Sequence, residues 1–547
     1  MACTVEDPAD EGAPEATGDL LDEQESVRGT DPPPTIPATP ESPEPPSLAA
    51  YGISAGHPAA VEAGMEMLAG GGNAVDAAIA AAYAVSVVEP FASGIGGGGA
   101  AIVAAPGTEP VAYDYREVVS QDGVIPATNI GIPGFVAGMG ALLDDHGTRT
   151  LGEVLAPAVD LARHGTATSA TVASQLRSAA YRLPVGQLPH LYPGGAPLDA
   201  GAPLVQEELA DTLELLARDG VDAFYRGALA NRLAVNVDGI DRASLEAYAV
   251  QRSRPPAGRV GDLEVLGAAP PLPGATLIQM LQVAEALDIG AIEPGSADHI
   301  HTISMAWRLA DQFVSWDLGD PAFIDVPLDE LTDPERNTAL AAEVPPNGFL
   351  SVDPGQPQGG LTGNTTHLTV VDADGMMVSM TNTITNFWGS GRYEAGFFLN
   401  DQLRRFSIGR SAANRPEPGR RSVSWALPAM VLDDEGRPVL GIGSPGGRRI
   451  PNILTQVLVR WGFHDQSLSD AVAATRFHLE GTELFVEEIP PAPIADDLRG
   501  RGYSALSVPG PPYYFGSVQA LVVDHDSGEV TGARDTRREG DWAVGTP

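Results

Sequence analysis

A short polar stretch that runs into an alternating, β-branched segment constrains this chain more than any other feature. It reads Gly363-Asn364-Thr365-Thr366-His367-Leu368-Thr369-Val370-Val371-Asp372, and its second half has the pattern of a β-strand. Thr365 stands at the head of that strand, just after a flexible, Gly-rich stretch at 355–363. If the chain were cut before Thr365, that one residue would hold both a hydroxyl nucleophile and an amine base. A lone Thr at the start of a strand is usually structural, so the rest of the chain must decide between these interpretations.

Composition separates an N-terminal tail from a folded remainder. Residues 1–47 are rich in Glu, Asp, Pro and Thr and have almost no large apolar side chains, so we expect a disordered acidic tail. The chain has 547 residues, 43 % of them hydrophobic, and its apolar segments are periodic. The part after the tail is therefore expected to fold around a sizeable core.

The charge of the chain limits its partners. The formal net charge is −40, and every basic residue is Arg because the sequence contains no lysine. Such an acidic surface argues against nucleic acid and against anionic membranes as partners. It favours a halophilic protein that works in concentrated salt, where charges are strongly screened. Compositional bias from a GC-rich genome is the alternative.

Cysteine and hydropathy patterns bear on the compartment. Cys3 is the single cysteine, which excludes internal disulfides and a Cys-based metal cluster. No apolar run has the length of a membrane span, and no signal-peptide segment precedes the folded part. The sequence as it stands predicts a cytoplasmic protein. An exported lipoprotein anchored at Cys3, with its signal upstream of this start, is the alternative.

The remaining patterns predict helices in the first part of the chain and strands in the second. We expect helices at 58–68, 74–88, 131–143, 151–164, from 275, at 297–310, 451–462 and 467–475. We expect strands at 100–104, 111–117, 263–266, 368–371, 377–382, 397–399, 429–432, 439–442, 484–486 and 518–523. This order suits two sheets packed between helical layers.

Two other patterns are better explained by structure than by ligand binding. The run Gly94–Gly99 matches G-x-G-x-x-G, but a helix precedes it and a strand follows it, which is the reverse of a dinucleotide site. A turn with close backbone approach is the better explanation. His299 and His301 are two residues apart in an expected helix, so they do not share a face and a metal site there is improbable.

Several motifs together carry a resemblance to a known family. They run from Gly56-His57-Pro58 and Gly70-Gly71-Gly72-Asn73-Ala74-Val75-Asp76-Ala77-Ala78 through the glycine run at 94–99, Tyr115-Arg116-Glu117, Pro133-Gly134, Leu318-Gly319-Asp320-Pro321, the Thr365 block and Gly443-Ser444-Pro445-Gly446-Gly447, and they end near Arg534. With these motifs, which cover nearly everything after the tail, the chain resembles the γ-glutamyltranspeptidases of the N-terminal-nucleophile hydrolases. The resemblance implies an α+β fold, the four-layer αββα sandwich, with no cofactor and no metal.

The resemblance also implies a maturation step and a reaction. The precursor would cut itself between Asn364 and Thr365, and the parts 48–364 and 365–547 would remain together as a heterodimer. The donor would be a small γ-glutamyl compound, glutathione-like, and the acceptor water or an amine.

Roles carry over residue by residue. Thr365 would be the nucleophile, and Thr383 the hydroxyl that hydrogen-bonds and tunes it. The backbone N–H groups of Gly446 and Gly447 would form the oxyanion hole. The donor's α-carboxylate would be held by Arg116 and Ser424, and Asn400 and Gln402 would line the donor pocket.

The departures from the family pattern concern the donor's ammonium group. Arg405 stands where the family has an Asp that binds this group, Thr385 replaces an Asn, and Trp425 replaces the second serine. The segment between Phe406 and Ser424 is also shorter than a full lid loop. Two like charges about 4 Å apart repel by about 4 kcal/mol at an effective dielectric constant of 20.

Two donor classes therefore stay open. Asp401 or another acid supplies the missing negative charge and the donor is an ordinary γ-glutamyl compound. Alternatively, the donor lacks a free ammonium, as in poly-γ-glutamate or a glutaryl amide of the kind that acylases cleave. A third hypothesis, from another class, is an uncut and inactive relative that acts as a binding protein; the intact Thr365, Thr383 and Gly446-Gly447 argue against it.

Overall fold

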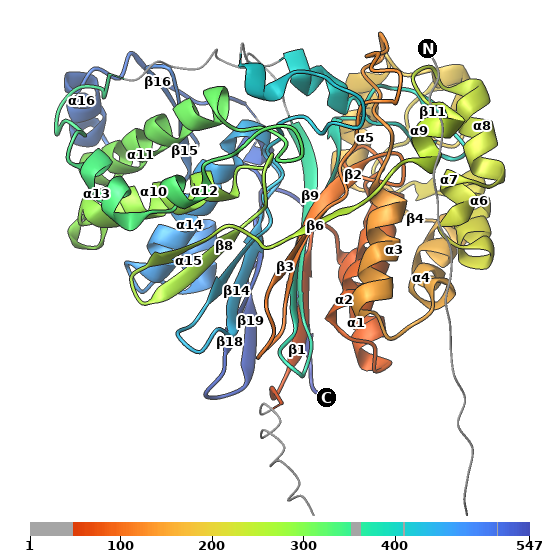
Figure 1. The fold of residues 1–547 in the computed structure, drawn as a ribbon, viewed down its shortest axis with the longest axis horizontal. Coiled ribbons are helices and arrows are strands. Elements are labelled where there is room, and N and C mark those ends of the chain that lie inside the picture. Colours follow the sequence, from red (N-terminus) through yellow and green to blue (C-terminus); the bar gives the residue numbers. More distant parts are fainter. Residues whose placement is uncertain (1–46, 352–362, 408–410, 511) are drawn as a thin grey trace, which may run out of the picture. The chain divides into compact units, whose positions relative to one another are not determined.

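Two antiparallel sheets lie face to face at the centre of the fold (Figure 1). The computed structural model describes residues 47–351, 363–407, 411–510 and 512–547. The first sheet has seven strands in the order β20 (Asp541–Gly545), β1 (Tyr51–Ala55), β9 (Gly363–Val371), β10 (Met377–Asn386), β2 (Gly98–Ala104), β3 (Val111–Asp114) and β6 (Gln251–Ser253). The second has six, in the order β19 (Glu529–Gly532), β18 (Gln519–Asp524), β14 (Pro438–Gly443), β13 (Ala429–Leu432), β8 (Leu263–Gly267) and β7 (Ala257–Val260). β9 contacts both β14 and β18, so the strand that carries the predicted nucleophile, Thr365, faces the second sheet.

Helices cover the outer face of each sheet (Figure 1). The seven-stranded sheet is covered by α1 (Pro58–Ala69), α2 (Ala74–Val88) and α3 (Phe135–His146), with α4 (Leu151–His164) and α6 (Glu207–Asp219) packed outside them. The six-stranded sheet is covered by α10 (Gly274–Ala286) and α14 (Ile450–Gly462), with α11 (Ala297–Trp316) packed against both helices. The order helix, sheet, sheet, helix confirms the predicted αββα sandwich.

Shorter elements complete the described part of the chain. The short helices are α5 (Ala170–Ala179), α7 (Asp222–Tyr225), α8 (Ala228–Asn236), α9 (Arg242–Glu246), α12 (Leu328–Leu331), α13 (Pro334–Ala341), α15 (Leu468–Ala473) and α16 (Ala492–Gly500). Small sheets are formed by β15 (Phe477–Glu480), β16 (Glu483–Val486) and β17 (Ala505–Ser507), by β11 (Tyr393–Glu394) and β12 (Phe397–Phe398), and by β4 (Thr166–Ala167) and β5 (Pro203–Leu204).

Helix α2 packs against β9, the strand of the predicted nucleophile. It starts with a capping box in which Asn73 and Asp76 satisfy each other's backbone N–H groups, and every one of its residues is buried. Because the helix is built mainly of Ala and Val, it packs closely against β9 and β10. At its first residue, the N–H of Ala74 donates to Asp372 Oδ2 at 2.9 Å, just beyond the end of β9.

The two sheets draw strands from both parts of the chain. The expected cut falls within the first residues of β9, so most of β9 and all of β10 and β20 follow it, yet they lie in one sheet with β1, β2, β3 and β6, which precede it. In the second sheet β7 and β8 likewise pair with strands that follow the cut. The parts 48–364 and 365–547 are therefore interleaved in space.

Most predicted elements occur, with shifts at their ends. α4 and β13 have the predicted bounds, whereas β3 ends at Asp114 instead of continuing to residue 117, and α3 begins at Phe135 instead of residue 131. The helices between 170 and 246 and the last strand, β20, were not predicted. The expected acidic tail at 1–46, with Cys3, and most of the Gly-rich stretch at 355–362 lie outside the described residues. In the part that is described, no helix combines the length and the apolar character needed to cross a membrane.

Candidate active site

Thr365 lies near the start of β9, a central strand, and its side chain is almost fully buried. The pairing of β9 with β10 shifts there: Thr366 pairs with Asn382, but Asn364 pairs with Thr385. Thr383 and Ile384 therefore form a bulge opposite Thr365. Bulges re-aim side chains and are common beside active sites. This bulge brings the predicted nucleophile and the predicted tuning hydroxyl together.

The bulge is held by a chain of hydrogen bonds. Thr383 Oγ1 accepts from the N–H of Thr385 at 2.8 Å, and Thr385 has a φ of +82°. The Thr385 hydroxyl donates to Gln402 Oε1 at 2.5 Å, and Gln402 Nε2 donates to Ser422 Oγ at 2.9 Å. Thr385, which departs from the family pattern, thus connects the bulge to the predicted donor pocket.

The glycine run at 94–99 supports the same bulge. A Cβ on Gly97 would lie 2.3 Å from the carbonyl oxygen of Thr383, and a Cβ on Gly99 would lie 2.4 Å from the carbonyl oxygen of Thr381. Only glycine allows the two backbones to approach so closely. The interpretation of this run as a close-approach turn is confirmed, and its neighbour is the site itself.

The Gly446-Gly447 turn lies between the end of β14 and the start of α14. Gly446 has a φ of +145° and Gly447 a φ of +60°, both in the region that favours glycine. The short 3-10 helix Gly447–Arg449 contacts β9, and it leads into the 13-residue helix α14. Backbone N–H groups at the start of a helix favour negative charge. The turn thus lies next to the strand that carries Thr365, and its role as an oxyanion hole stays a prediction.

Arg116 lies just after the end of β3 and is completely buried. Its Nε and Nη2 donate to the carboxylate of Asp114 at 3.0 and 2.6 Å, and its Nη1 donates to the Ser422 carbonyl at 2.7 Å. These bonds use three of the five N–H groups of the guanidinium. Burial alone would raise the pKa of Asp114, but Arg116 and Arg421 outweigh it and hold that pKa below its usual range. Asp114 thus fixes the orientation of the guanidinium, and the predicted contact of Arg116 with a donor carboxylate stays a prediction.

Asn400 is engaged by backbone groups. Its Nδ2 donates to the carbonyls of Gly96 and Gly131 at 2.9 and 3.0 Å, and its Oδ1 accepts from the N–H of Gly131 at 2.9 Å. Asn400 therefore joins the glycine run to the loop before α3, and its predicted contact with the donor stays a prediction. Ser424 is buried two residues beyond Ser422, on the same segment as the Arg116 contact.

Arg405 is buried in the short 3-10 helix Gln402–Ser407. Burial lowers the pKa of Arg405 to about 10, and Asp401 opposes this effect. Among the described residues its Nε has no hydrogen-bond partner. The Asp401 carboxylate is held by Asn386 through its N–H and Nδ2 at 3.1 and 2.6 Å and by Arg404 at 3.2 Å. The Asp401 carboxylate thus already has hydrogen-bond partners and an ion pair within the protein, which makes it a weaker partner for a donor's ammonium group.

Three residues beside the nucleophile were missed in the sequence. The Thr366 hydroxyl donates to Glu89 Oε2 at 2.6 Å, and Arg538 Nη1 donates to the Thr365 carbonyl at 3.4 Å. Burial raises the pKa of Glu89 to about 7, against the opposing effects of Arg538 and Thr366. Glu89 and Thr366 are 277 residues apart in the chain, so no local pattern joins them. The only signal was an acid directly after the apolar segment that forms α2.

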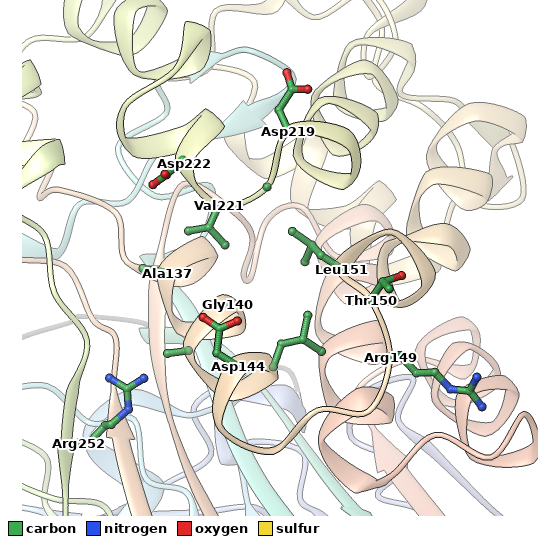
Figure 2. A pocket seen from close by; sticks show the side chains of 13 residues that line it. Ala137, Gly140, Asp144, Arg149, Thr150, Leu151, Asp219, Val221, Asp222 and Arg252 are labelled. Atoms are coloured by element: carbon green, nitrogen blue, oxygen red, sulfur yellow. The ribbon is translucent and has the colours of Figure 1, made fainter.

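Metal-ligating groups and the surface cavity near α3 lie apart from the predicted site residues or are absent from the described part of the chain. No group of three or more His, Cys, Asp or Glu within the described ranges could hold a metal ion. A cavity of about 700 Å³ lies between α3, the start of α4 and the α6–α7 turn, with Asp144, Asp219, Asp222, Arg149 and Arg252 around it (Figure 2). None of the predicted site residues lines this cavity.

Comparisons with known proteins bear on the family and the fold of the chain. The family model described as "Gamma-glutamyltranspeptidase" matches residues 60–545. The capsule biosynthesis protein CapD proenzyme of Bacillus anthracis is 36 % identical over 492 residues, which cover 90 % of this chain and 90 % of the relative. The glutathione hydrolase proenzyme of Escherichia coli (strain K12) is 31 % identical over 532 residues, which cover 89 % of this chain and 90 % of that protein. The crystal structure of cephalosporin acylase from Bacillus halodurans has the same fold, with a TM-score of 0.83, 23 % identity and coverage of 93 % of this chain and 98 % of that one.

Proposed function

Because the chain belongs to the γ-glutamyltranspeptidase family, we propose that it is a self-processed threonine amidohydrolase. In this proposal it moves a γ-glutamyl-type acyl group from an amide to water or to an amine acceptor. The observation that carries the proposal is the position of Thr365, opposite the Thr383 bulge and beside the Gly446-Gly447 turn.

The first step is maturation. The Thr365 hydroxyl attacks the carbonyl carbon of Asn364, the peptide C–N bond breaks, and the acyl group moves from nitrogen to oxygen. Water then hydrolyses the ester and releases a fragment that begins at Thr365. Two relatives are described as proenzymes, which supports a precursor that is cut to give the active enzyme. The two parts remain together as a heterodimer because their strands share both sheets.

The second step is acyl transfer. The freed α-amine of Thr365 takes the proton of its own hydroxyl, and the oxygen attacks the donor amide. The N–H groups of Gly446 and Gly447 stabilise the oxyanion, the leaving amine takes the proton, and an acyl-threonine ester remains. Water or an acceptor amine then removes the acyl group. No residue role in this sequence of steps requires a metal or a cofactor.

The charged residues of the site indicate which chemical class of donor the enzyme would accept. We assign the donor carboxylate to Arg116 and Ser424, with Gln402 on the same hydrogen-bond network. Arg405 is a buried cation where an ammonium group would otherwise bind, and Asp401 is held by Asn386 and Arg404. These observations favour donors without a free α-ammonium, such as glutaryl amides or poly-γ-glutamate, over glutathione-like donors.

Two measurements test the proposal. On denaturing electrophoresis the purified protein should give two fragments, and Thr365→Ala should give one uncut and inactive chain. In molar salt, the purified enzyme should turn over glutaryl-anilide appreciably relative to γ-glutamyl-anilide. Arg405→Asp should shift that preference toward the γ-glutamyl compound, whereas Arg499→Asp, on the exposed face of α16, should not. A fully active, uncut chain would contradict the proposal, and a strong γ-glutamyl preference that is lost on Asp401→Ala would restore the glutathione-like donor.

A further inference from the structure

Glu89 is a buried acid directly behind the nucleophile strand. It follows the last residue of α2, its side chain is almost completely excluded from solvent, and Thr366 donates to its Oε2 at 2.6 Å. Its Oε1 has no hydrogen-bond partner among the described residues. None of the steps proposed above uses this carboxyl group, although it lies against the residue that follows the nucleophile.

The groups around Glu89 have opposing effects on whether its carboxyl group is ionised. Burial disfavours the carboxylate, and so does its position at the negative end of the α2 dipole. Thr366 and Arg538 favour the carboxylate, and the result is a pKa of about 7. The group therefore changes charge within the pH range in which an α-amine also begins to titrate.

The contacts of Arg538 and Thr366 tie this charge to Thr365. Arg538 interacts electrostatically with Glu89 and donates through Nη1 to the Thr365 carbonyl at 3.4 Å. Gly56 leaves room for the arrangement, since a Cβ at that position would lie 3.1 Å from Thr366 Oγ1 and 3.3 Å from Glu89 Oε2. The carboxyl is thus fixed by close packing one residue from the amine that cleavage would create.

Two further titratable groups among the described residues lie near Glu89 and Arg538. Glu539, next to Arg538, raises the pKa of Glu89, and its own Oε1 accepts from the N–H of Thr171 at 3.0 Å. His57, at the start of α1, faces Glu539, and burial lowers the pKa of this histidine despite that neighbour. Arg538 therefore stands between two acids, and ionisation of Glu89 changes the balance of charge beside Thr365.

We propose that Glu89 is a positioning residue of the reaction, whose change of charge sets the proton affinity of the Thr365 α-amine. The inference rests on the proposed function, because it needs the cut before Thr365. When Glu89 is ionised, the negative charge stabilises the ammonium form of the amine and raises the pKa of that amine. When Glu89 is neutral, the amine loses its proton at lower pH and becomes an active base. The two groups titrate as a coupled pair.

The absence of lysine makes the amine directly observable. A protein of this sequence has two amines after the cut, one at the start of the chain and one on Thr365, because none of its side chains carries one. The rate at which a small amine-reactive reagent labels the Thr365 peptide, followed by mass spectrometry as a function of pH, measures the pKa of the Thr365 amine. The amine at the start of the chain serves as an internal reference.

In Glu89→Gln the midpoint of labelling at Thr365 should fall by about 0.5–1 pH unit relative to the unchanged protein, and the rising limb of the pH–rate profile should move with it. Thr366→Val should move both in the same direction by less, because loss of the hydrogen bond leaves Glu89 neutral to higher pH. Thr366→Ser should restore them. Glu529→Gln, at an exposed position of β19, is the matched control and should change neither.

An unchanged midpoint in Glu89→Gln would overturn the inference. If that variant is not cut or does not fold, equal midpoints in Thr366→Val and Thr366→Ser would overturn it instead. Failure of the proposed function has a different signature, since the unchanged protein would then yield no labelled Thr365 peptide at all.

Discussion

The Gly446-Gly447 turn shows how much one residue can decide at this site. Gly446 has a φ of +145°, and a Cβ there would lie 3.1 Å from Ile453 Cδ1. Gly446→Ala should displace the N–H proposed for the oxyanion hole, and we expect turnover of a γ-linked anilide to fall by about 10²–10³-fold. Gly436→Ala, in the β13–β14 turn with a φ of +76° and open space around it, places a Cβ at a positive φ away from the site and serves as the control. Steady-state kinetics on both variants check the prediction, and equal losses would assign the effect to strain alone.

At the same scale, local sequence motifs predicted the candidate catalytic residues but not the residues that contact and position them. Thr365, Thr383, Gly446 and Gly447 are carried by short motifs, and the structure brings them together. Glu89 and Arg538 come from distant segments and meet only because α2 and the end of the chain converge on β9. The Asp114 partner of Arg116 was also beyond reach, because an ion pair two residues apart depends on where the strand ends.

Among the elements, α2 and β9 act as one unit. The helix is attached to the strand at both ends, by Asp372 at its first turn and by Glu89 at its last. Asp372→Ala should remove the cap contact to Ala74 and two bonds to the following turn, and we expect a loss of about 1–2 kcal/mol in the free energy of unfolding. Denaturant unfolding of the uncut Thr365→Ala background measures this without interference from the cut. Asp374→Ala, exposed in the same turn, should cost much less, and an equal cost would contradict the argument.

Element prediction succeeded for long segments with a clear hydrophobic period and failed for short ones. α4 has capping signals and clear amphipathic spacing, and its bounds were predicted to the residue. The short helices α7 to α9 have too few turns to show a period, and they are stabilised by packing on α6 and on each other. Strand β20 has only five residues, lies at the edge of the sheet and pairs with β1 alone, and none of its side chains is fully buried, so it shows no clear alternation of buried and exposed positions.

For the whole molecule, the excess of acidic residues is the dominant electrostatic fact. The chain has 72 Asp and Glu against 32 Arg, so repulsion opposes the folded state at low salt. Raising NaCl from 0.1 to 1 M shortens the Debye length from about 10 to about 3 Å, and Tm should rise. Thermal unfolding of the uncut Thr365→Ala chain across that range measures the effect, with sucrose at equal osmolarity as the control. A Tm that stays constant or falls with salt would show that local ion pairs outweigh the net charge.

The interleaved sheets have a further consequence for how the protein refolds. Before the cut, β9 and β1 belong to one polymer, so refolding is unimolecular and independent of concentration. After the cut the same pairing needs an encounter between two separate chains, neither of which holds a complete sheet. The proposed maturation would therefore change the molecularity of folding, and a processed molecule that unfolds in dilute solution would refold only if its two chains met again.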